Sequence, residues 1–337
     1  MIRVLIVDDS AVVRKVLTDE LSKVEDIEVV GSAIDPYMAR EKIARLSPDV
    51  LTLDVEMPRM DGLTFLSKLM QHHPMPVVVV SSLTPQNSDN ALRALSLGAV
   101  DIVSKPGSQF STPDVQKHLV QAIRAASKAR VFARAETPSK TPAVTFNNLE
   151  TTHKIIAIGA STGGTQAIEA VLRGFPANAP GTVIVQHMPQ GFTGPFAKRL
   201  NQICAMEVRE AKHGDPVVPG VALVAPGNQH MLLQKSGAKY FVSLKNGPLV
   251  HYQRPAVDVL FQSVSRHAGK NATGVLLTGM GADGASGLLT MRQSGARTIA
   301  QDEQTSVVYG MPREAARLGA VDEILPLNAI ARAALNV

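Results

Sequence analysis

The chain has 337 residues, 45% of them hydrophobic and 19% charged. At roughly 150 residues per domain this length predicts two domains, and the composition excludes wholesale disorder. A single cysteine, Cys204, excludes an internal disulfide and fits a reducing compartment. The first residues reach two aspartates after a short apolar run, and no window approaches the roughly 18 apolar residues of a membrane span. We therefore expect a cytoplasmic protein without direct membrane insertion.

The net charge of +5 raises the question of a nucleic-acid partner, but the charge is unevenly divided. Residues 1–127 hold 13 basic and 16 acidic side chains, residues 128–152 hold 4 and 2, and residues 153–337 hold 17 and 11. The basic residues of the last section are scattered, and aromatic residues make up only 4% of the chain, with no Trp for base stacking. We expect no nucleic-acid partner.

Residues 1–127 alternate five times between a short apolar run and an amphipathic pattern. Strands are expected at residues 4–7, 29–33, 50–53, 77–80 and 102–103. These runs are unbroken, as in a parallel sheet that is covered on both faces. Helices are expected at residues 11–24, 37–46, 63–72, 90–97 and 115–129. The pattern predicts a five-stranded doubly wound α/β domain whose functional site lies at the carboxyl ends of the strands.

The apolar periodicity fades around residues 135–152, where Pro, Ser, Thr and Asn gather, and we take residues 128–152 as an interdomain linker. A second α/β pattern follows over residues 153–337. Its expected strands include residues 155–158, 183–186, 275–278 and 298–300. After Met206 the pattern changes to short strands with turns, and residues 240–244 alternate like half of a hairpin. We expect a second domain with a parallel sheet and an antiparallel insertion.

Acidic side chains follow two strands of the first domain. Asp8 and Asp9 come directly after the first strand, and Asp54 directly after the third. In a doubly wound sheet these two strand ends are neighbours, so three carboxylates converge, and oxygen ligands of this kind suit Mg²⁺. Ser81 and Lys105 end the fourth and fifth strands and add a hydroxyl and an ammonium group. The set predicts a site for a phosphoryl group, against the simpler alternative that the aspartates only cap helices.

These residues fall in motifs that resemble a response-regulator receiver domain, namely Asp8-Asp9-Ser10, Asp54-Val55-Glu56-Met57-Pro58 with Asp61-Gly62, Ser81-Ser82 and Lys105-Pro106. The resemblance implies that Asp54 takes a phosphoryl group from a histidine kinase. It also implies that Asp8 and Asp9 help to hold Mg²⁺ beside Asp54. Ser81 and Lys105 would sense the phosphoryl group.

Ser161 lies in the sequence Gly-Ala-Ser-Thr-Gly-Gly at residues 159–164, between an expected strand and an expected helix. The segment fits G-x-S-x-G, in which small neighbours let a sharp turn expose the serine hydroxyl. The same loop could instead bind phosphate through helix-start amides, although it lacks the G-K-[ST] ending of a P-loop, or it could be only a tight turn. The motif alone does not decide among a hydrolase, a phosphate-binding module and a turn.

Partners for a catalytic serine are expected at other strand ends. His187 closes the strand that follows Ser161 and is placed to act as a general base, unless it is a surface histidine. A glycine-rich turn at residues 279–284 presents Asp283 as the orienting carboxylate, with Asp258 and Asp302 as rivals. The order Ser, His, Asp differs from that of the α/β-hydrolases, so that fold is disfavoured, although the geometry of a triad does not depend on chain order.

Four segments together resemble the catalytic domain of the chemotaxis protein-glutamate methylesterase (CheB) family: residues 159–164, 186–189, 254–258 and 278–285. The order of receiver, linker and esterase is also similar. The resemblance implies Ser161 as nucleophile, His187 as base and Asp283 as orienting carboxylate. Thr162 and the main chain of Met280 match positions near the active site, although Met280 could equally be an apolar plug under the turn.

The resemblance implies a phosphorylation-regulated serine hydrolase with no metal in the esterase domain. Its substrates would be glutamyl methyl esters on chemoreceptors, and it would also deamidate receptor glutamines. Arg254 is expected either at the substrate groove or at a helix start on the surface. The receiver is expected to occlude the esterase until Asp54 is phosphorylated. Two other classes remain open at this point: a receiver joined to a phosphate-binding module, and a DNA-binding regulator, for which we find no helix-turn-helix pattern.

Overall fold

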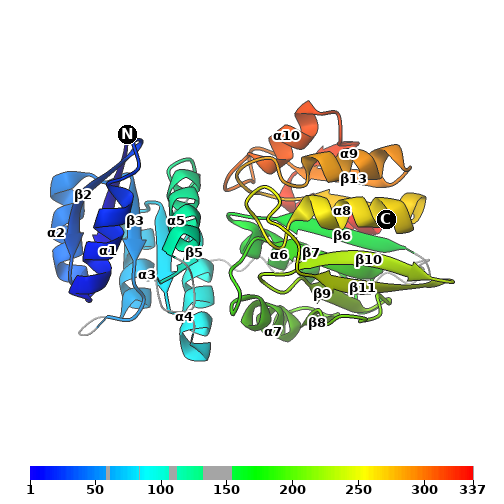
Figure 1. The fold of residues 1–337 in the computed structure, drawn as a ribbon, viewed down its shortest axis with the longest axis horizontal. Coiled ribbons are helices and arrows are strands. Elements are labelled where there is room, and N and C mark those ends of the chain that lie inside the picture. The colour runs from blue at the N-terminus through cyan, green and yellow to red at the C-terminus, as the bar shows by residue number, and fades with distance from the viewer. Residues whose placement is uncertain (58–60, 83, 106–111, 132–153, 337) are drawn as a thin grey trace. The chain divides into compact units, whose positions relative to one another are not determined.

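The computed structural model describes residues 1–57, 61–82, 84–105, 112–131 and 154–336. The chain divides into two compact units, Met1–Thr137 and Pro138–Val337. This division falls inside the expected linker, most of which, residues 132–152, lies outside the described residues. Each unit has its own sheet and is described by itself (Figure 1).

The sheet of the first unit has five parallel strands in the order β2-β1-β3-β4-β5. The strands are β1 (Ile2–Val7), β2 (Ile27–Ala33), β3 (Val50–Leu53), β4 (Val77–Ser81) and β5 (Asp101–Ser104). Every residue of β3 and β4 is buried, as the unbroken apolar runs require for a sheet covered on both faces. The doubly wound first domain is confirmed.

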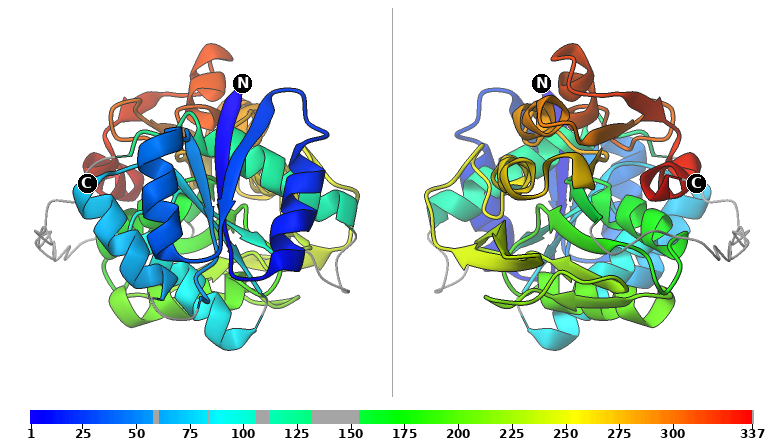
Figure 2. Two further views of the ribbon diagram at one scale, coloured as in Figure 1. Left: turned by 90° about the vertical axis from the view of Figure 1, so that its left-hand side faces the viewer. Right: turned by 90° about the vertical axis from the view of Figure 1, so that its right-hand side faces the viewer.

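Helices cover both faces of this sheet, as Figure 2 shows. They are α1 (Ala11–Leu21), α2 (Pro36–Leu46), α3 (Gly62–His72), α4 (Pro85–Ser96) and α5 (Thr112–Ala126). The start expected for α4, residue 90, is wrong by five residues. Thr84 accepts a hydrogen bond from the amide of Asn87 as the N-cap, and Pro85 takes the first helical position. This local capping begins the helix before its apolar periodicity starts.

The sheet of the second unit has seven strands, all parallel, in the order β14-β13-β12-β6-β7-β9-β8. They are β6 (Ile155–Ala160), β7 (Gly181–Gln186), β8 (Glu207–Glu210), β9 (Val221–Val224), β12 (Ala272–Leu276), β13 (Arg297–Gln301) and β14 (Glu323–Leu325). The antiparallel insertion is present as one hairpin of β10 (His230–Ser236) and β11 (Lys239–Lys245). The insertion is smaller than expected, because β8 and β9 extend the parallel sheet.

The helices of the second unit are α6 (Gly164–Arg173), α7 (Thr193–Ile203), α8 (Val257–His267), α9 (Ala285–Gln293), α10 (Met311–Arg317) and α11 (Leu327–Leu335), with a short 3-10 turn at Gly269–Asn271. Helix α6 contacts α7 and α11, whereas α8 packs against α9 and against β10 of the hairpin. Phe261 of α8, Leu223 of β9 and Met231 of β10 are fully buried in one hydrophobic core. The hairpin therefore shares the core of the sheet. None of the described helices is both long enough and apolar enough to cross a membrane.

Candidate active site

The acidic residues of the first unit lie together at the carboxyl edge of its sheet. The amide of Asp8 still pairs with Ala33 of β2, and the amide of Asp54 with Val7 of β1. Each aspartate therefore continues the sheet ladder by one residue, which places its side chain at the sheet edge. One carboxylate oxygen from each of Asp8, Asp9 and Asp54 lies within 4.8 Å of the others. This short separation confirms that the three carboxylates converge, as the order of the strands predicts.

Lys105 lies in this pocket. Its Nζ donates to Asp54 Oδ2 at 2.7 Å and lies 3.0 Å from Asp8 Oδ2. Burial raises the pKa of Asp54 to about 6, although the hydrogen bond from Lys105 acts in the opposite direction. Burial alone would lower the pKa of Lys105, but Asp54 and Asp8 outweigh it and raise that pKa. The pocket thus keeps one ammonium group beside carboxylates that are mostly withdrawn from water.

The donor set of the acidic pocket fits Mg²⁺. Oδ2 of Asp8 is buried, and Lys105 Nζ lies 3.0 Å from it. One ammonium group does not balance the charge of three carboxylates that lie this close together, so a further cation would be favourable among them, and hard oxygen ligands suit Mg²⁺. The cluster of Asp8, Asp9 and Asp54 is therefore typical of a magnesium site.

Ser81 ends β4, the strand between β3 and β5, and is fully buried. Its neighbour across the ladder is Ser104, and the amide of Lys105 donates to the carbonyl of Ser81. The strand order thus places Ser81 between the strand that leads to Asp54 and the strand that leads to Lys105. Pro58 and Pro106 of the receiver motifs lie outside the described residues.

In the second unit, Ser161 follows β6 in a sharp strand-to-helix turn. Its amide donates to the carbonyl of Thr278 at 3.0 Å, and its carbonyl accepts the amide of Gly164 at 2.7 Å. Gly163 has a φ of 77° as the N-cap of α6, a left-handed conformation that suits glycine. The turn predicted from G-x-S-x-G is thus present, and both main-chain polar groups of the serine are held in place.

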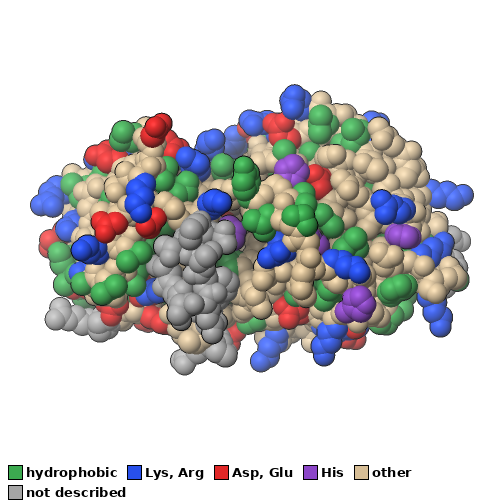
Figure 3. All heavy atoms as spheres, viewed as in Figure 1, with side chains coloured by type: hydrophobic (Ala, Val, Ile, Leu, Met, Phe, Trp, Pro, Cys, Tyr) green, Lys and Arg blue, Asp and Glu red, His purple; other side chains and the backbone are tan. Residues whose placement is uncertain are grey.

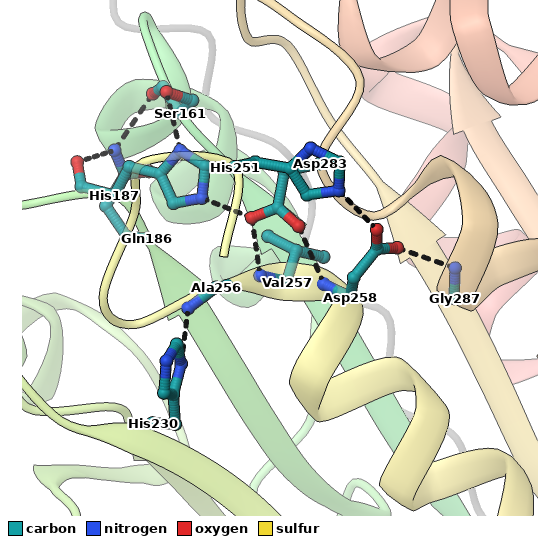
Figure 4. A network of polar contacts seen from close by, with 10 residues as sticks. All are labelled: Ser161, Gln186, His187, His230, His251, Ala256, Val257, Asp258, Asp283 and Gly287. Carbon is teal, nitrogen blue, oxygen red and sulfur yellow. Dashed lines mark hydrogen bonds and ion pairs between the residues drawn. The ribbon is translucent and has the colours of Figure 1, made fainter. Parts of the chain in front are cut away.

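Ser161, His187 and Asp283 form one hydrogen-bonded chain (Figure 4). Nδ1 of His187 is 3.1 Å from Ser161 Oγ, and Nε2 of His187 is 2.7 Å from Asp283 Oδ2. Because an ionised carboxylate only accepts hydrogen bonds, Nε2 carries the proton and Nδ1 is free to accept from the serine hydroxyl. The ring is thus turned relative to the chymotrypsin-type triad, in which Nε2 faces the serine.

Three adjacent strands supply these side chains. Strand β6 lies between β7 and β12, so the ends that carry Ser161, His187 and the turn to Asp283 are neighbours. The chain leaves β6 for β7 on one side and later returns to β12 on the other, which makes β6 the switch point of the sheet. Ligand sites of open α/β sheets lie at such points.

Asp283 is held as a carboxylate at the amino end of α8. Its Oδ2 also accepts the amide of Val257 at 2.7 Å, and its Oδ1 accepts the amide of Asp258 at 2.9 Å. Burial by itself would raise the pKa of Asp283. The hydrogen bond from His187 and the two helix-start amides outweigh burial and hold that pKa below its ordinary value. Asp283 is therefore charged and fixed in orientation.

Thr162 directly follows Ser161, and Met280 directly follows Gly279, which lies close to Ser161. Thr162 is buried, and its carbonyl accepts the hydroxyl of Thr278 at 3.0 Å. Met280 is partly exposed in the turn after β12. The amides of Met280 and Gly281 donate to no acceptor within the described part of the chain. A turn with unused N–H groups next to a nucleophile is suited to binding an oxyanion.

Two family models match the chain. The model described as CheB methylesterase matches residues 156–334, and the response regulator receiver domain matches residues 4–116. A protein-glutamate methylesterase/protein-glutamine glutaminase of Syntrophus aciditrophicus (strain SB) is 58% identical over 333 residues, 98% of this chain and 97% of its own length. This chain belongs to that CheB family.

Other members extend the comparison. A protein-glutamate methylesterase/protein-glutamine glutaminase of Anaeromyxobacter dehalogenans (strain 2CP-C) is 56% identical over 331 residues, 98% of this chain and 93% of its own. The crystal structure of the Thermotoga maritima CheB methylesterase catalytic domain superimposes with a TM-score of 0.54 and 35% identity, over 55% of this chain and 98% of that one. The resemblance inferred from the motifs is confirmed for both parts of the chain.

The CheB fold here also places Gln186 under the triad, in a role that the sequence did not suggest. Gln186 is 3% exposed, and its Nε2 donates to the carbonyl of Ser161 at 2.9 Å and to the carbonyl of His187 at 3.0 Å. The side chain thus ties the main chains of nucleophile and base together. The available signal was a polar residue at the end of an otherwise apolar strand, directly before the histidine.

The rival carboxylates have other partners. Asp258 lies in the first turn of α8, where its Oδ1 accepts the amide of Gly287 at 2.6 Å and its Oδ2 is 2.8 Å from Nε2 of His251. Asp302 follows β13, and its Oδ1 accepts the amide and the hydroxyl of Thr305. Neither hydrogen-bonds His187, so the choice of Asp283 agrees with the geometry. One ring nitrogen of His251 and one carboxylate oxygen each of Asp258 and Asp283 lie within 4.8 Å of one another.

The surface charge of the second unit is dispersed. In the space-filling view, Lys and Arg side chains on the right-hand part of the molecule are separated by other side chains and form no continuous patch (Figure 3). Several are paired with carboxylates, as in Arg292–Asp322 at 2.7 Å and Arg297–Glu323 at 2.6 Å. The face in view therefore lacks the concentrated positive field of a nucleic-acid surface.

Proposed function

We propose that Ser161, His187 and Asp283 carry the hydrolysis in this CheB-family methylesterase and glutaminase, with glutamyl methyl esters and glutamines of chemoreceptors as substrates. The observation that carries the proposal is the hydrogen-bonded chain from Ser161 Oγ through both ring nitrogens of His187 to Asp283. The relatives' names supply the reaction. The geometry supplies a nucleophile, a base and an orienting carboxylate for it.

The acylation step follows from the proton positions. Nδ1 of His187 takes the hydroxyl proton as Ser161 Oγ attacks the γ-carbonyl carbon of the ester. Asp283 stabilises the imidazolium that forms at Nε2. The developing oxyanion lies near the turn whose Met280 and Gly281 amides are unused by the described chain. Nδ1 then gives its proton to the methoxy oxygen of the tetrahedral intermediate, the C–O bond breaks and methanol leaves; with a glutamine the proton goes to the amide nitrogen, the C–N bond breaks and ammonia leaves.

Deacylation repeats the same proton path with water. His187 Nδ1 takes a proton from a water molecule, whose oxygen attacks the acyl carbon, and then returns the proton to Ser161 Oγ. The product is a free glutamate side chain. Gln186 supports both steps, because it fixes the main chains of Ser161 and His187 relative to each other.

In the first unit we assign Asp54 as the phosphoryl acceptor, with a histidine kinase as the donor. Asp8, Asp9 and Asp54 would hold Mg²⁺, which when bound neutralises charge on the phosphoryl oxygens. The Lys105 ammonium group, 2.7 Å from Asp54 Oδ2, offers a second positive charge to the phosphoryl group. Ser81 offers a hydroxyl from the neighbouring strand end.

The substitution Ser161→Ala tests the catalytic assignment. Because it removes the attacking oxygen, we expect methanol release from methylated receptor membranes to fall by about 10⁴-fold or more. Phosphorylation of Asp54 by a small phosphodonor should be unchanged, which serves as the control for an intact first unit. Substantial methanol release by Ser161→Ala would contradict the serine mechanism.

A further inference from the structure

The segment between β11 and α8, residues 246–256, passes beside the triad, and we call it the rim loop. Its first attachment is the guanidinium of Arg254. Nε and Nη2 donate to Asn228 Oδ1 at 3.0 and 2.6 Å, and Nη1 donates to the carbonyl of Gly247 at 2.6 Å. One side chain near the end of the loop thus holds the start of the same loop. Arg254 therefore braces the main chain of the loop, a role that neither sequence-based alternative for this residue, the substrate groove or a helix start on the surface, included.

The second attachment is His230, the first residue of β10, which is 3% exposed. Its Nδ1 accepts the amide of Ala256 at 3.2 Å, so the ring proton is on Nε2, which donates to the carbonyl of Pro248 at 2.8 Å. A buried neutral imidazole therefore bridges the early and late parts of the rim loop.

The third attachment joins the rim loop to the triad. Nε2 of His251 is 2.8 Å from Asp258 Oδ2, and the amide of Asp258 donates to Asp283 at 2.9 Å. Figure 4 shows this second chain of contacts beside the first. A ligand atom of His251 lies within 4.8 Å of a carboxylate oxygen of Asp283. The middle of the rim loop is thus at the edge of the catalytic site.

At the same place the backbone adopts an unfavourable conformation. His251 and Tyr252 have φ values of 51° and 62°, two successive side-chain-bearing residues in the left-handed region. This conformation is uncommon for any residue except glycine, and for a bulky one it marks strain. The three attachments hold the strained backbone in place. Backbone strain that is maintained at the edge of an active site indicates that the side chains of the strained segment have a function there.

Beside the polar Asn246 and His251, the rim loop presents two large apolar side chains to solvent. Tyr252 is 65% exposed and Leu249 is 48% exposed, although leucine in particular is usually buried in a folded protein. Single exposed apolar residues are normal on a protein surface. Here two of them lie on one braced loop beside a catalytic carboxylate, where a bound substrate would cover them.

We propose that Leu249 and Tyr252 bind the receptor polypeptide on either side of the glutamyl ester, so that the rim loop selects a protein substrate. This inference rests on the function proposed above. A methyl ester offers few atoms for recognition, whereas the main chain and aliphatic side chains around it can cover a leucine side chain and a tyrosine ring. Tyrosine suits such a contact, since its ring is apolar and rigid and its hydroxyl remains able to hydrogen-bond.

The test measures methanol release by the full-length protein as a function of the concentration of methylated receptor membranes. Tyr252→Ala and Leu249→Ala should each raise KM by about five- to tenfold and keep kcat within about twofold, because they remove contacts made equally in ground and transition states. Val218→Ala is the matched control. Val218 is 41% exposed and precedes β9, at the amino ends of the strands, away from the site.

An unchanged KM in both rim-loop variants would overturn the proposal, as would a fall in kcat alone, which would place the loop's effect on the triad. Higher activity of Tyr252→Ala without a phosphodonor would identify the first unit as the occupant and also overturn it. Thermal unfolding midpoints identify a variant that fails to fold, in which case the other rim-loop variant decides. If the wild-type protein releases no methanol, the proposed function fails instead.

Discussion

Asp283 illustrates how neighbouring groups fix the charge of one residue. Burial disfavours its carboxylate, yet three donors converge on it, the ring of His187 and the amides of Val257 and Asp258. The net effect is a pKa below the ordinary value of 3.8. A carboxyl with a lowered pKa keeps its charge until the pH falls through that lowered value. Asp283 is thus ionised throughout the range in which an imidazole titrates.

The pH dependence of hydrolysis follows from this charge state. We expect protonation of Asp283 to leave kcat/KM unchanged above about pH 5, because the pKa of this carboxyl is lowered and its charge is lost only as the pH falls through that lowered value. Initial rates of methanol release, measured without a phosphodonor, provide the profile. A limiting slope of two above pH 5 would contradict the assignment, since it would mean that Asp283 is protonated in that range.

At the scale of elements, the site depends on how closely the turn after β12 approaches the turn after β6. A Cβ atom built on Gly279 would lie 2.7 Å from Ser161 Cβ and 2.2 Å from Met311 Sδ. Neither gap admits a methyl group without displacing the nucleophile or α10. Gly279 is therefore required by packing at the contact between two strand ends, and this contact brings the turn of residues 279–284 beside the serine.

The substitution Gly279→Ala tests this packing. We expect it to lower the stability of the second unit by about 1–3 kcal/mol, as overpacking does, and to reduce kcat more than it raises KM. Chemical denaturation and methanol release measure the two effects. Gly194→Ala is the control within the same unit, because its added Cβ would come no closer than 3.4 Å to another heavy atom. Equal kcat values for the two variants would contradict the proposed role of Gly279.

Most elements were predicted from local patterns, and the errors have local causes. The apolar runs at β3, β4, β6 and β7 are unbroken because both faces are buried, so hydrophobicity alone located them. The local pattern predicts β8 and β9 as part of an antiparallel insertion, because the turns around them resemble those of hairpins. In the structure β8 pairs in parallel with β9, and β9 pairs in parallel with β7. These pairings join segments that are distant in the sequence, so no local pattern predicts them.

At the scale of the whole molecule, the chain joins a receiver unit to a methylesterase unit. The two units have separate sheets, and one carries the acidic pocket while the other carries the triad. The Thermotoga maritima catalytic domain was crystallised as a separate domain, and this chain matches 98% of it. We therefore expect residues 153–337 to fold without the first unit. The domain limits of 1–127, 128–152 and 153–337 stay predictions.

Comparison of the fragment 153–337 with the whole chain tests regulation. If the unphosphorylated receiver restricts the triad, the fragment should release methanol several-fold faster than the whole chain, and a small phosphodonor should reduce this difference. Asp54→Asn in the whole chain should remove the response to the phosphodonor, because it lacks the phosphoryl-accepting carboxylate. Equal activities of the fragment and the unphosphorylated whole chain would count against this form of regulation.

The sequence by itself determined the two α/β units, the five carboxyl-edge residues of the receiver and the Ser161, His187 and Asp283 set. These residues directly follow predicted strands or lie in glycine-rich turns, and parallel strands end at a common edge, so local order was enough to bring them together. Only the tertiary structure decided how they are held. The orientation of the His187 ring, the clamp of Gln186 and the attachment of the rim loop to Asp258 depend on contacts between distant segments. Such contacts arise from side-chain packing and hydrogen bonding in three dimensions, which no periodicity along the chain encodes.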